Sequence, residues 1–260
     1  MLRLKEKLKN KRFWGVLLIF FMAPVGWFFV RNRPENIGLK PDGITEDDFH
    51  STVTPRVHIS EEPWTLKQAM KTRAFWLMIY CAVVPALVNT GLTFHMVSII
   101  NKKGFTSGFA AYILSISAMI RFPLTFLAGY MLDRTRVYIV KGINFFLLTG
   151  AVLLLMQADS KITIIVYALV HGFFMAFDGV STGVLWPNYF GRKNLGSIRD
   201  FAMTAMVIGS SLGPLPFGIA YDIFGGYHEI MLAVLILPAL AIIASLISPP
   251  PEYKKKWGHN

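Results

Sequence analysis

One apolar stretch of the chain contains a residue type that membranes rarely hold. Residues 108–132, GFAAYILSISAMIRFPLTFLAGYML, are long enough to cross a bilayer as a helix, since about 20 helical residues span roughly 30 Å. Arg121 lies near the middle of this stretch, and its guanidinium stays protonated in proteins. Because the forked guanidinium matches a carboxylate, we expect Arg121 to bind an anionic substrate. The alternative is a structural role, in which Arg121 pairs with Asp178 or with backbone carbonyls.

Polar side chains near Arg121 extend this candidate substrate site. Ser117 and Thr125 are each four residues from Arg121, so the three form one polar stripe on a helix face. Asn89 and Thr90 lie in the preceding apolar block and are candidate hydrogen-bonding groups of a cavity. We therefore include all four in the predicted substrate site.

His171 and Asp178 are ionisable groups inside a later apolar block. They are seven residues apart, which places them on one helix face. Such groups inside a membrane relay protons in many carriers, so both are candidates for coupling proton movement to anion transport. In the alternative, Asp178 neutralises Arg121 and His171 is only hydrogen-bonded.

The composition indicates an integral membrane protein. Hydrophobic residues make up 54% of the 260 residues and charged residues only 16%, against about 25% in soluble proteins. The net charge of +11 could suggest nucleic-acid binding, but the basic residues cluster at the ends of apolar blocks, where they set membrane orientation. The single cysteine, Cys81, excludes an intrachain disulfide.

Seven apolar blocks are long enough to span a membrane, so we predict an all-α membrane protein with seven transmembrane helices. In chain order the blocks are residues 13–30, 75–100, 108–132, 137–158, 162–188, 201–223 and 230–247. A basic N-terminus precedes the first span within residues 1–30, and the last six form a bundle over residues 74–248. Residues 31–73 are predicted to be a linker that ends in a short amphipathic helix, and residues 249–260 a basic tail.

The basic residues predict the orientation. Residues 31–73 contain seven Lys or Arg, and the same side receives the basic turns after the third and fifth spans and the tail. This bias places the linker and the C-terminus in the cytoplasm, for a multi-pass protein of the cell membrane. The first twelve residues, with six Lys or Arg, conflict with this orientation. We expect the conflict to reflect a larger architecture, in which a missing N-terminal half or a second protomer completes the protein.

Several sequence segments, in order, resemble the major facilitator superfamily of transporters. They include PENIGLKPDG after the first span, GYMLDRTR after the third and GPLPFGIAYDIFGGY through the sixth. The segments TLKQAMKTRAFW, TGLTFHMVSI and LWPNYFGRKNLGSIRD are similar to monocarboxylate-transporter-like and oxalate:formate-antiporter-like members. The resemblance implies that the last six spans are the C-terminal half bundle of this fold and that the first is the last helix of the other half. It also implies that the fourth span, which contains Lys141 and Asn144, lies at the periphery.

The resemblance also assigns roles to individual residues. His95 belongs to the TGLTFH segment, which implies a role in substrate binding or at an outer gate. A cytoplasmic gating motif is implied for Gly129, Asp133, Arg134 and Arg136, with Gly129 allowing close helix approach; the alternative is a solvated turn that only sets orientation. Independently, the helix-breaking residues of the sixth span predict a hinge at Gly213, Pro214, Pro216 and Gly218.

The sequence contains no nucleophile motif, phosphate-binding loop or metal-ligand cluster, so we predict neither an enzyme nor a bound cofactor or metal. The function predicted is secondary active transport of small organic anions, in particular monocarboxylates, by alternating access with possible proton coupling. Its partners are then the carboxylate substrate and the lipid bilayer. The alternatives are a membrane scaffold that transports nothing and a half-transporter fragment that depends on a partner.

Overall fold

A computed structural model describes residues 64–252 of the chain, and within that range it contains eight helices and no strand. The helices are α2 (Leu66–Met70), α3 (Arg73–Lys102), α4 (Ser107–Leu132), α5 (Val137–Met156), α6 (Lys161–Phe190), α7 (Leu195–Leu212), α8 (Pro214–Phe224) and α9 (His228–Leu246). Because α7 and α8 together form one span, six units are long and apolar enough to cross a membrane. The predicted all-α membrane bundle is confirmed for these six spans. The predicted first span, residues 13–30, the N-terminus and most of the linker lie outside the described residues.

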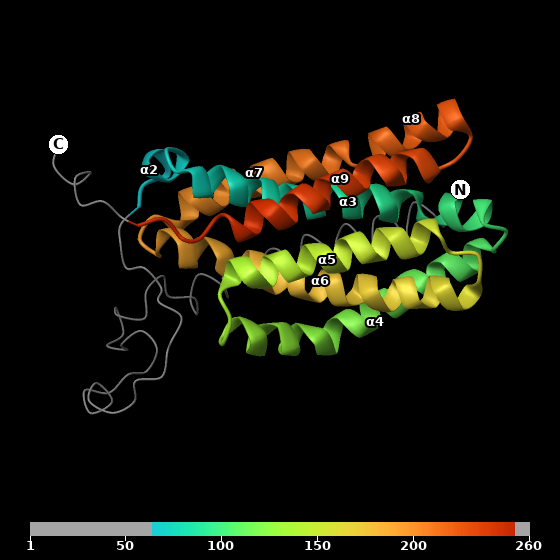
Figure 1. Ribbon diagram of the computed structural model, residues 1–260, viewed down its shortest axis with the longest axis horizontal. Helices are drawn as coiled ribbons and strands as arrows, with labels where there is room; N and C mark the ends of the chain where they lie inside the picture. Colours follow the sequence, from blue (N-terminus) through green and yellow to red (C-terminus); the bar gives the residue numbers. More distant parts are fainter. Residues whose placement is uncertain (1–63, 253–260) are drawn as a thin grey trace, which may run out of the picture. The chain divides into compact units, whose positions relative to one another are not determined.

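The six spans run alternately up and down, so their turns gather at two ends of the bundle (Figure 1). One end holds α2 and the turns at residues 133–136 and 191–194, and we call it the Asp133 end. The other holds the turns at residues 103–106, 157–160 and 225–227, and we call it the Lys103 end.

Local sequence explains where several helices begin and end. The hydroxyls of Thr72, Thr106 and Ser160 cap α3, α4 and α6 by accepting a hydrogen bond from a backbone N–H of the first turn. Gly225 ends α8 with φ of 68°, a left-handed conformation that glycine adopts without steric penalty. The short α2 has a capping box between Thr65 and Gln68 and is separated from α3 by a break at residues 71–72.

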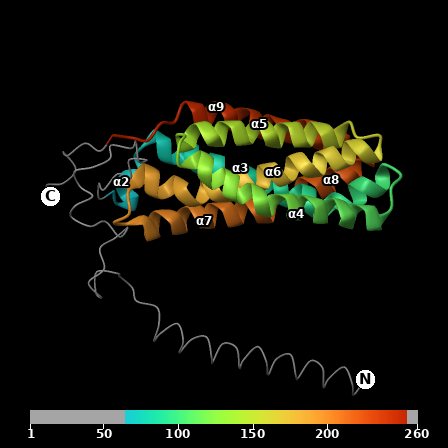
Figure 2. The ribbon, with the colours of Figure 1, turned by 90° about the horizontal axis from the view of Figure 1, so that it is seen from below.

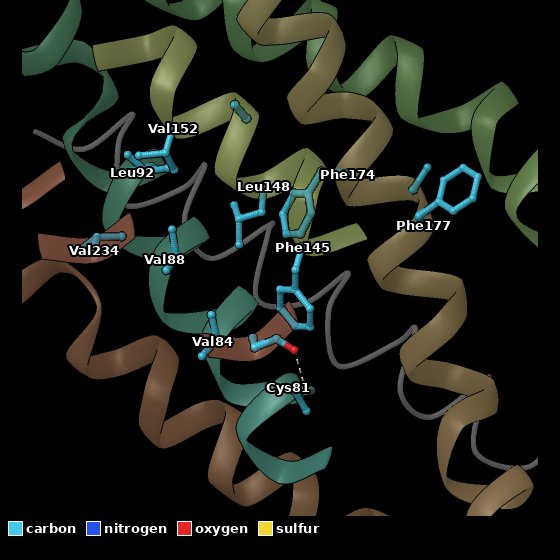
Figure 3. Packing of buried hydrophobic residues seen from close by; sticks show 14 of the residues in the cluster. Cys81, Val84, Val88, Leu92, Phe145, Leu148, Val152, Phe174, Phe177 and Val234 are labelled. Carbon is cyan, nitrogen blue, oxygen red and sulfur yellow. Dashed lines mark hydrogen bonds between the residues drawn. The ribbon is translucent and has the colours of Figure 1, made fainter. Parts of the chain in front are cut away.

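The helices pack as a curved row whose ends are α4 and α7. Neighbours along the row are α4, α6, α5, α9, α3 and then α7 with α8, while α4 against α3 and α6 against α7 are smaller contacts. Figure 3 shows the core of the row, in which Val84, Val88 and Leu92 of α3 face Leu148 and Val152 of α5. The two end helices bury the smallest share of their residues, and Figure 2 shows α4 and α7 along the same side of the bundle.

Candidate functional site

Arg121 lies midway along α4, and its side chain is exposed within the described part of the chain. Its Nη2 atom lies 3.5 Å from the position that a Cβ would occupy on Gly179 of α6. The guanidinium therefore lies beside α6, next to a residue that has no side chain. Within residues 64–252 it makes no hydrogen bond or ion pair that meets ordinary distance limits. Arg121 is thus a cation in the middle of a membrane span without an acidic partner in this range.

Asp178, the one acidic residue of α6, pairs with a residue other than Arg121. Nζ of Lys141 on α5 donates to Oδ1 of Asp178 at 2.7 Å and to the hydroxyl of Thr182 at 2.6 Å. Asn144 adds a longer contact to the same carboxylate oxygen, at 3.4 Å. Among residues 64–252 the ion-pair partner of Asp178 is therefore Lys141, and no ion pair joins Asp178 to Arg121.

Lys141 is a buried charged residue that the sequence interpretation did not include in the candidate site. It was expected near the end of a peripheral span, yet its side chain is fully buried, while 17% of the Asp178 side chain is exposed. A lysine one turn inside a helix resembles one that reaches back to the membrane surface. One signal in the sequence could have indicated this pair. The third to fifth predicted spans contain one acid, Asp178, and two cations, Arg121 and Lys141, that could pair with it.

These positions leave the membrane-spanning parts of the three helices with a net positive charge. Apart from Lys161 at the first position of α6, the charged side chains of α4, α5 and α6 are Arg121, Lys141 and Asp178. Lys141 and Asp178 neutralise each other, so the charge of Arg121 remains uncompensated within these helices. An unpaired charge near the bilayer centre costs several kcal/mol, which an anion beside Arg121 would reduce.

His171 and Asn89 join α6 to α3 in the interior. Nε2 of His171 lies 3.0 Å from Oδ1 of Asn89, so with this amide assignment the imidazole donates through Nε2. His171 is 4% exposed, and its Nδ1 and the hydroxyl of Tyr167 have no hydrogen-bond partner among the described residues. Thr90 lies one residue further on and exchanges a hydrogen bond of 2.8 Å with Ser210 of α7. Asn89 and Thr90 therefore link α3 to two different neighbours.

The predicted stripe of Ser117, Arg121 and Thr125 does not form one exposed surface. Ser117 is buried, and its hydroxyl lies 3.2 Å from the carbonyl of Ile113 and 3.0 Å from that of Ala168 on α6. Thr125 is exposed, and its hydroxyl donates to the carbonyl of Arg121 at 2.8 Å. In this arrangement Ser117 joins α4 to α6, while Arg121 and Thr125 are exposed within residues 64–252.

His95 lies away from this group, toward the Lys103 end. Its Nε2 donates to the carbonyl of Pro214 at 3.1 Å, and its Nδ1 lies 3.2 Å from the hydroxyl of Tyr227. The ring also stacks on Phe217, with an interplanar angle of 16°. His95 thus holds α3 against α8 and the turn before α9.

The residues of the predicted hinge lie where α7 meets α8. Gly213 ends α7 and Pro214 begins α8, so the sixth span is broken at this point. A Cβ on Gly213 would collide with the backbone carbonyl oxygen of Leu87, which shows why glycine is needed for α7 to approach α3. Pro216 and Gly218 follow within the first turns of α8. A hinge motion at this break stays a prediction.

The residues of the predicted gating motif lie at the Asp133 end. Asp133 caps the C-terminus of α4, the guanidinium of Arg134 lies 3.8 Å above the ring of Tyr130, and Arg136 donates to the hydroxyl of Tyr138 at 3.1 Å. A Cβ on Gly129 would meet no atom within 4 Å in the described part of the chain. Close helix approach in this conformation therefore does not account for Gly129, and the gating role itself stays a prediction.

The fold and these polar groups define a multi-pass integral membrane protein with a buried ion pair and, midway along α4, an arginine without an acidic partner among residues 64–252. The chain belongs to the Major Facilitator Superfamily, a family of membrane transporters, which its sequence matches over residues 12–198. The matched region includes Arg121, Lys141, His171 and Asp178. A comparison with curated proteins gives no match.

Proposed function

We propose that this transporter is a secondary carrier of small organic anions, in particular monocarboxylates, and that Arg121 binds the carboxylate group. The observation that carries this proposal is the uncompensated charge of Arg121 in the middle of α4, beside a glycine of α6. A carboxylate can accept two parallel hydrogen bonds from the guanidinium and neutralise it at the same time.

The position of Arg121 suits alternating access. Carriers of this type bind their substrate near the bilayer midplane and expose the site to each side in turn. In the proposed cycle, anion binding removes the charge that opposes rearrangement of the helices within the membrane. The break between α7 and α8 is the point at which the sixth span would bend, and the residues at 129–136 would form and release the closure at the Asp133 end.

Proton coupling is proposed to involve Asp178, with His171 as the second candidate. Asp178 carries the only carboxylate within α4, α5 and α6, and 17% of its side chain is exposed. Protonation of this carboxylate would leave Lys141 and Arg121 as two cations without an internal acid. Proton binding at Asp178 would therefore favour anion binding at Arg121, and by linkage the anion would favour the proton. This reciprocal effect would produce symport of the anion with a proton.

The experiment is uptake of labelled lactate, pyruvate and oxalate into proteoliposomes that contain the full chain. We expect saturable uptake of at least one carboxylate, its loss in Arg121→Gln, and partial retention in Arg121→Lys, which keeps the charge but loses the fork. An imposed inward proton gradient should accelerate uptake by the parent, and Asp178→Asn should abolish that acceleration. Normal uptake by Arg121→Gln would overturn the role of Arg121.

The second candidate function is that of a fragment or scaffold that depends on a membrane partner. The observation that favours it is the exposure of Arg121 within residues 64–252, since a lone guanidinium in mid-bilayer needs a protein or aqueous neighbour. Absence of saturable uptake by the purified chain, together with recovery of uptake on co-expression with a partner protein, would support this candidate.

A further inference from the structure

A polar cavity lies between α3 and α8 at the Lys103 end. It has a volume of about 520 Å³, within the usual range for small-molecule sites. Phe94 and Val97 supply an apolar wall, and Ser98, Asn101, Lys102 and Tyr221 supply polar groups. Along α3, Lys102 is thirteen residues beyond Asn89, which corresponds to roughly 20 Å of helix. The cavity is therefore separate from the interior groups around His171 and Asp178.

The lining of this cavity favours an anion. The side chains of Ser98, Asn101, Lys102 and Tyr221 can each donate a hydrogen bond, and no Asp or Glu lines the cavity. Nζ of Lys102 lies 5.8 Å from the ring centroid of Tyr221 and makes no ion pair within residues 64–252. Asn101 is already hydrogen-bonded to Ser107 of α4, which fixes its position at the rim.

The neighbouring lysine serves a different purpose. Nζ of Lys103 donates to the carbonyl of Met156 at 3.0 Å and so joins α3 to the end of α5. Burial lowers the pKa of Lys103, against the opposing effect of the charge of Asp159. Lys102 is thus the cation available to a ligand in the cavity between α3 and α8.

Hydrogen bonds hold the two walls of the cavity in place. His95 lines the cavity on α3, and its two ring nitrogens contact Pro214 of α8 and Tyr227 of the following turn. Both nitrogens are therefore occupied, and the ring acts as a fixed wall. Because the walls are linked before any ligand arrives, the cavity is preorganised, which reduces the entropic penalty of binding.

We propose that this cavity is a recognition site at which a small carboxylate first binds, with Lys102 contacting the carboxylate and Phe94 and Val97 contacting the apolar part. The ligand class rests on the proposed function, whereas the site is formed by residues of α3 and α8 and includes no residue of α4. Its effect would be to raise the local anion concentration at one mouth of the carrier.

Cysteine labelling tests binding at this cavity without relying on transport. The only native cysteine, Cys81, is fully buried, so the parent chain serves as the labelling blank. Val97→Cys places a thiol in the cavity lining at a residue that is 43% exposed, and Ile162→Cys places one at the same end on an exposed residue of α6 outside the cavity. N-ethylmaleimide is the reagent, because an uncharged reagent is not itself attracted by Lys102.

We expect lactate to slow labelling of Val97→Cys and to leave Ile162→Cys unchanged. The protection should disappear when Lys102→Gln is added and should persist with Lys161→Gln, an exposed lysine at the same end. If Val97→Cys reacts too slowly to measure, Phe94→Cys replaces it, since that residue also lines the cavity and is 74% exposed. Equal labelling with and without lactate at the reactive position would overturn the proposed site.

Uptake kinetics separate this proposal from the proposed function. Lys102→Gln should raise the KM for lactate by about fivefold, the effect of one unit charge at 4 Å in water, and leave kcat nearly unchanged. The increase should shrink at 1 M salt, where the screening length falls to about 3 Å. An unchanged KM in a variant with normal uptake would overturn the cavity proposal alone. Absence of uptake by the parent would overturn the proposed function, while the labelling result would still decide the cavity.

Discussion

The buried pair of Lys141 and Asp178 makes a quantitative prediction about stability. Lys141 is fully buried and Asp178 is 17% exposed, so removing either charge leaves the other in a low-dielectric interior. Breaking such a pair costs about 3–5 kcal/mol. We expect the lower part of this range, about 3 kcal/mol for Lys141→Met, because the remaining carboxylate can take up a proton and is partly exposed. The double variant Lys141→Met/Asp178→Asn leaves neither charge unpaired in the interior. Its loss of unfolding free energy should therefore be smaller than the sum of the losses in the two single variants.

The measurement is a double-mutant cycle on the purified full chain, unfolded by increasing SDS in mixed micelles. We expect a coupling free energy of about 2 kcal/mol or more, since contacting residues in one ion-pair network couple by roughly 0.5–3 kcal/mol. Losses that add to within about 0.5 kcal/mol would show that the two side chains do not interact in the folded protein. Asp178 would then not be neutralised by Lys141, and the conclusion that Arg121 lacks a compensating acid in α4, α5 and α6 would fail.

The remaining predictions concern glycines at helix contacts, each with a matched control. Gly172→Ala should destabilise the protein by about 1–3 kcal/mol, because the new Cβ would lie 2.7 Å from a backbone oxygen of α4. Gly150→Ala, with no atom within 4 Å of its Cβ position, should be neutral or slightly stabilising in the same unfolding assay. Gly179→Val should impair carboxylate uptake by displacing the guanidinium of Arg121 from α6, and Gly183→Val, in open space four residues later, should have a much smaller effect. Equal uptake by the two valine variants would contradict the position assigned to that guanidinium.

The sequence predicted the six described membrane spans well because each of these spans is a continuous apolar block. Most helices begin within two residues of the predicted block, as α6 does at Lys161, but α7 begins at Leu195, six residues before the predicted span. The break in the sixth span was also predicted, since Gly213 and Pro214 stand together in the sequence. These features depend on local sequence, which a single chain displays directly.

The pairing of side chains could not be predicted from periodicity alone. His171 and Asp178 share a helix face, yet His171 contacts Asn89 of α3 while Asp178 contacts Lys141 of α5. One face of α6 meets two neighbours because α6 lies inside the row of helices, and long side chains such as that of Lys141 extend the reach of a contact. Helix order and crossing decide such pairs, and spacing within one helix does not specify them.

The most direct test of the central claim asks whether the protein recognises the negative charge of its substrate. Uptake of labelled lactate by the full chain in proteoliposomes is measured in competition with unlabelled lactate and with lactamide, a neutral molecule of nearly the same shape. Our account predicts that lactate competes at low concentration and that lactamide competes weakly or not at all, because only the carboxylate can neutralise Arg121. Equal competition by the two compounds would contradict the claim that this uncompensated arginine selects an anion.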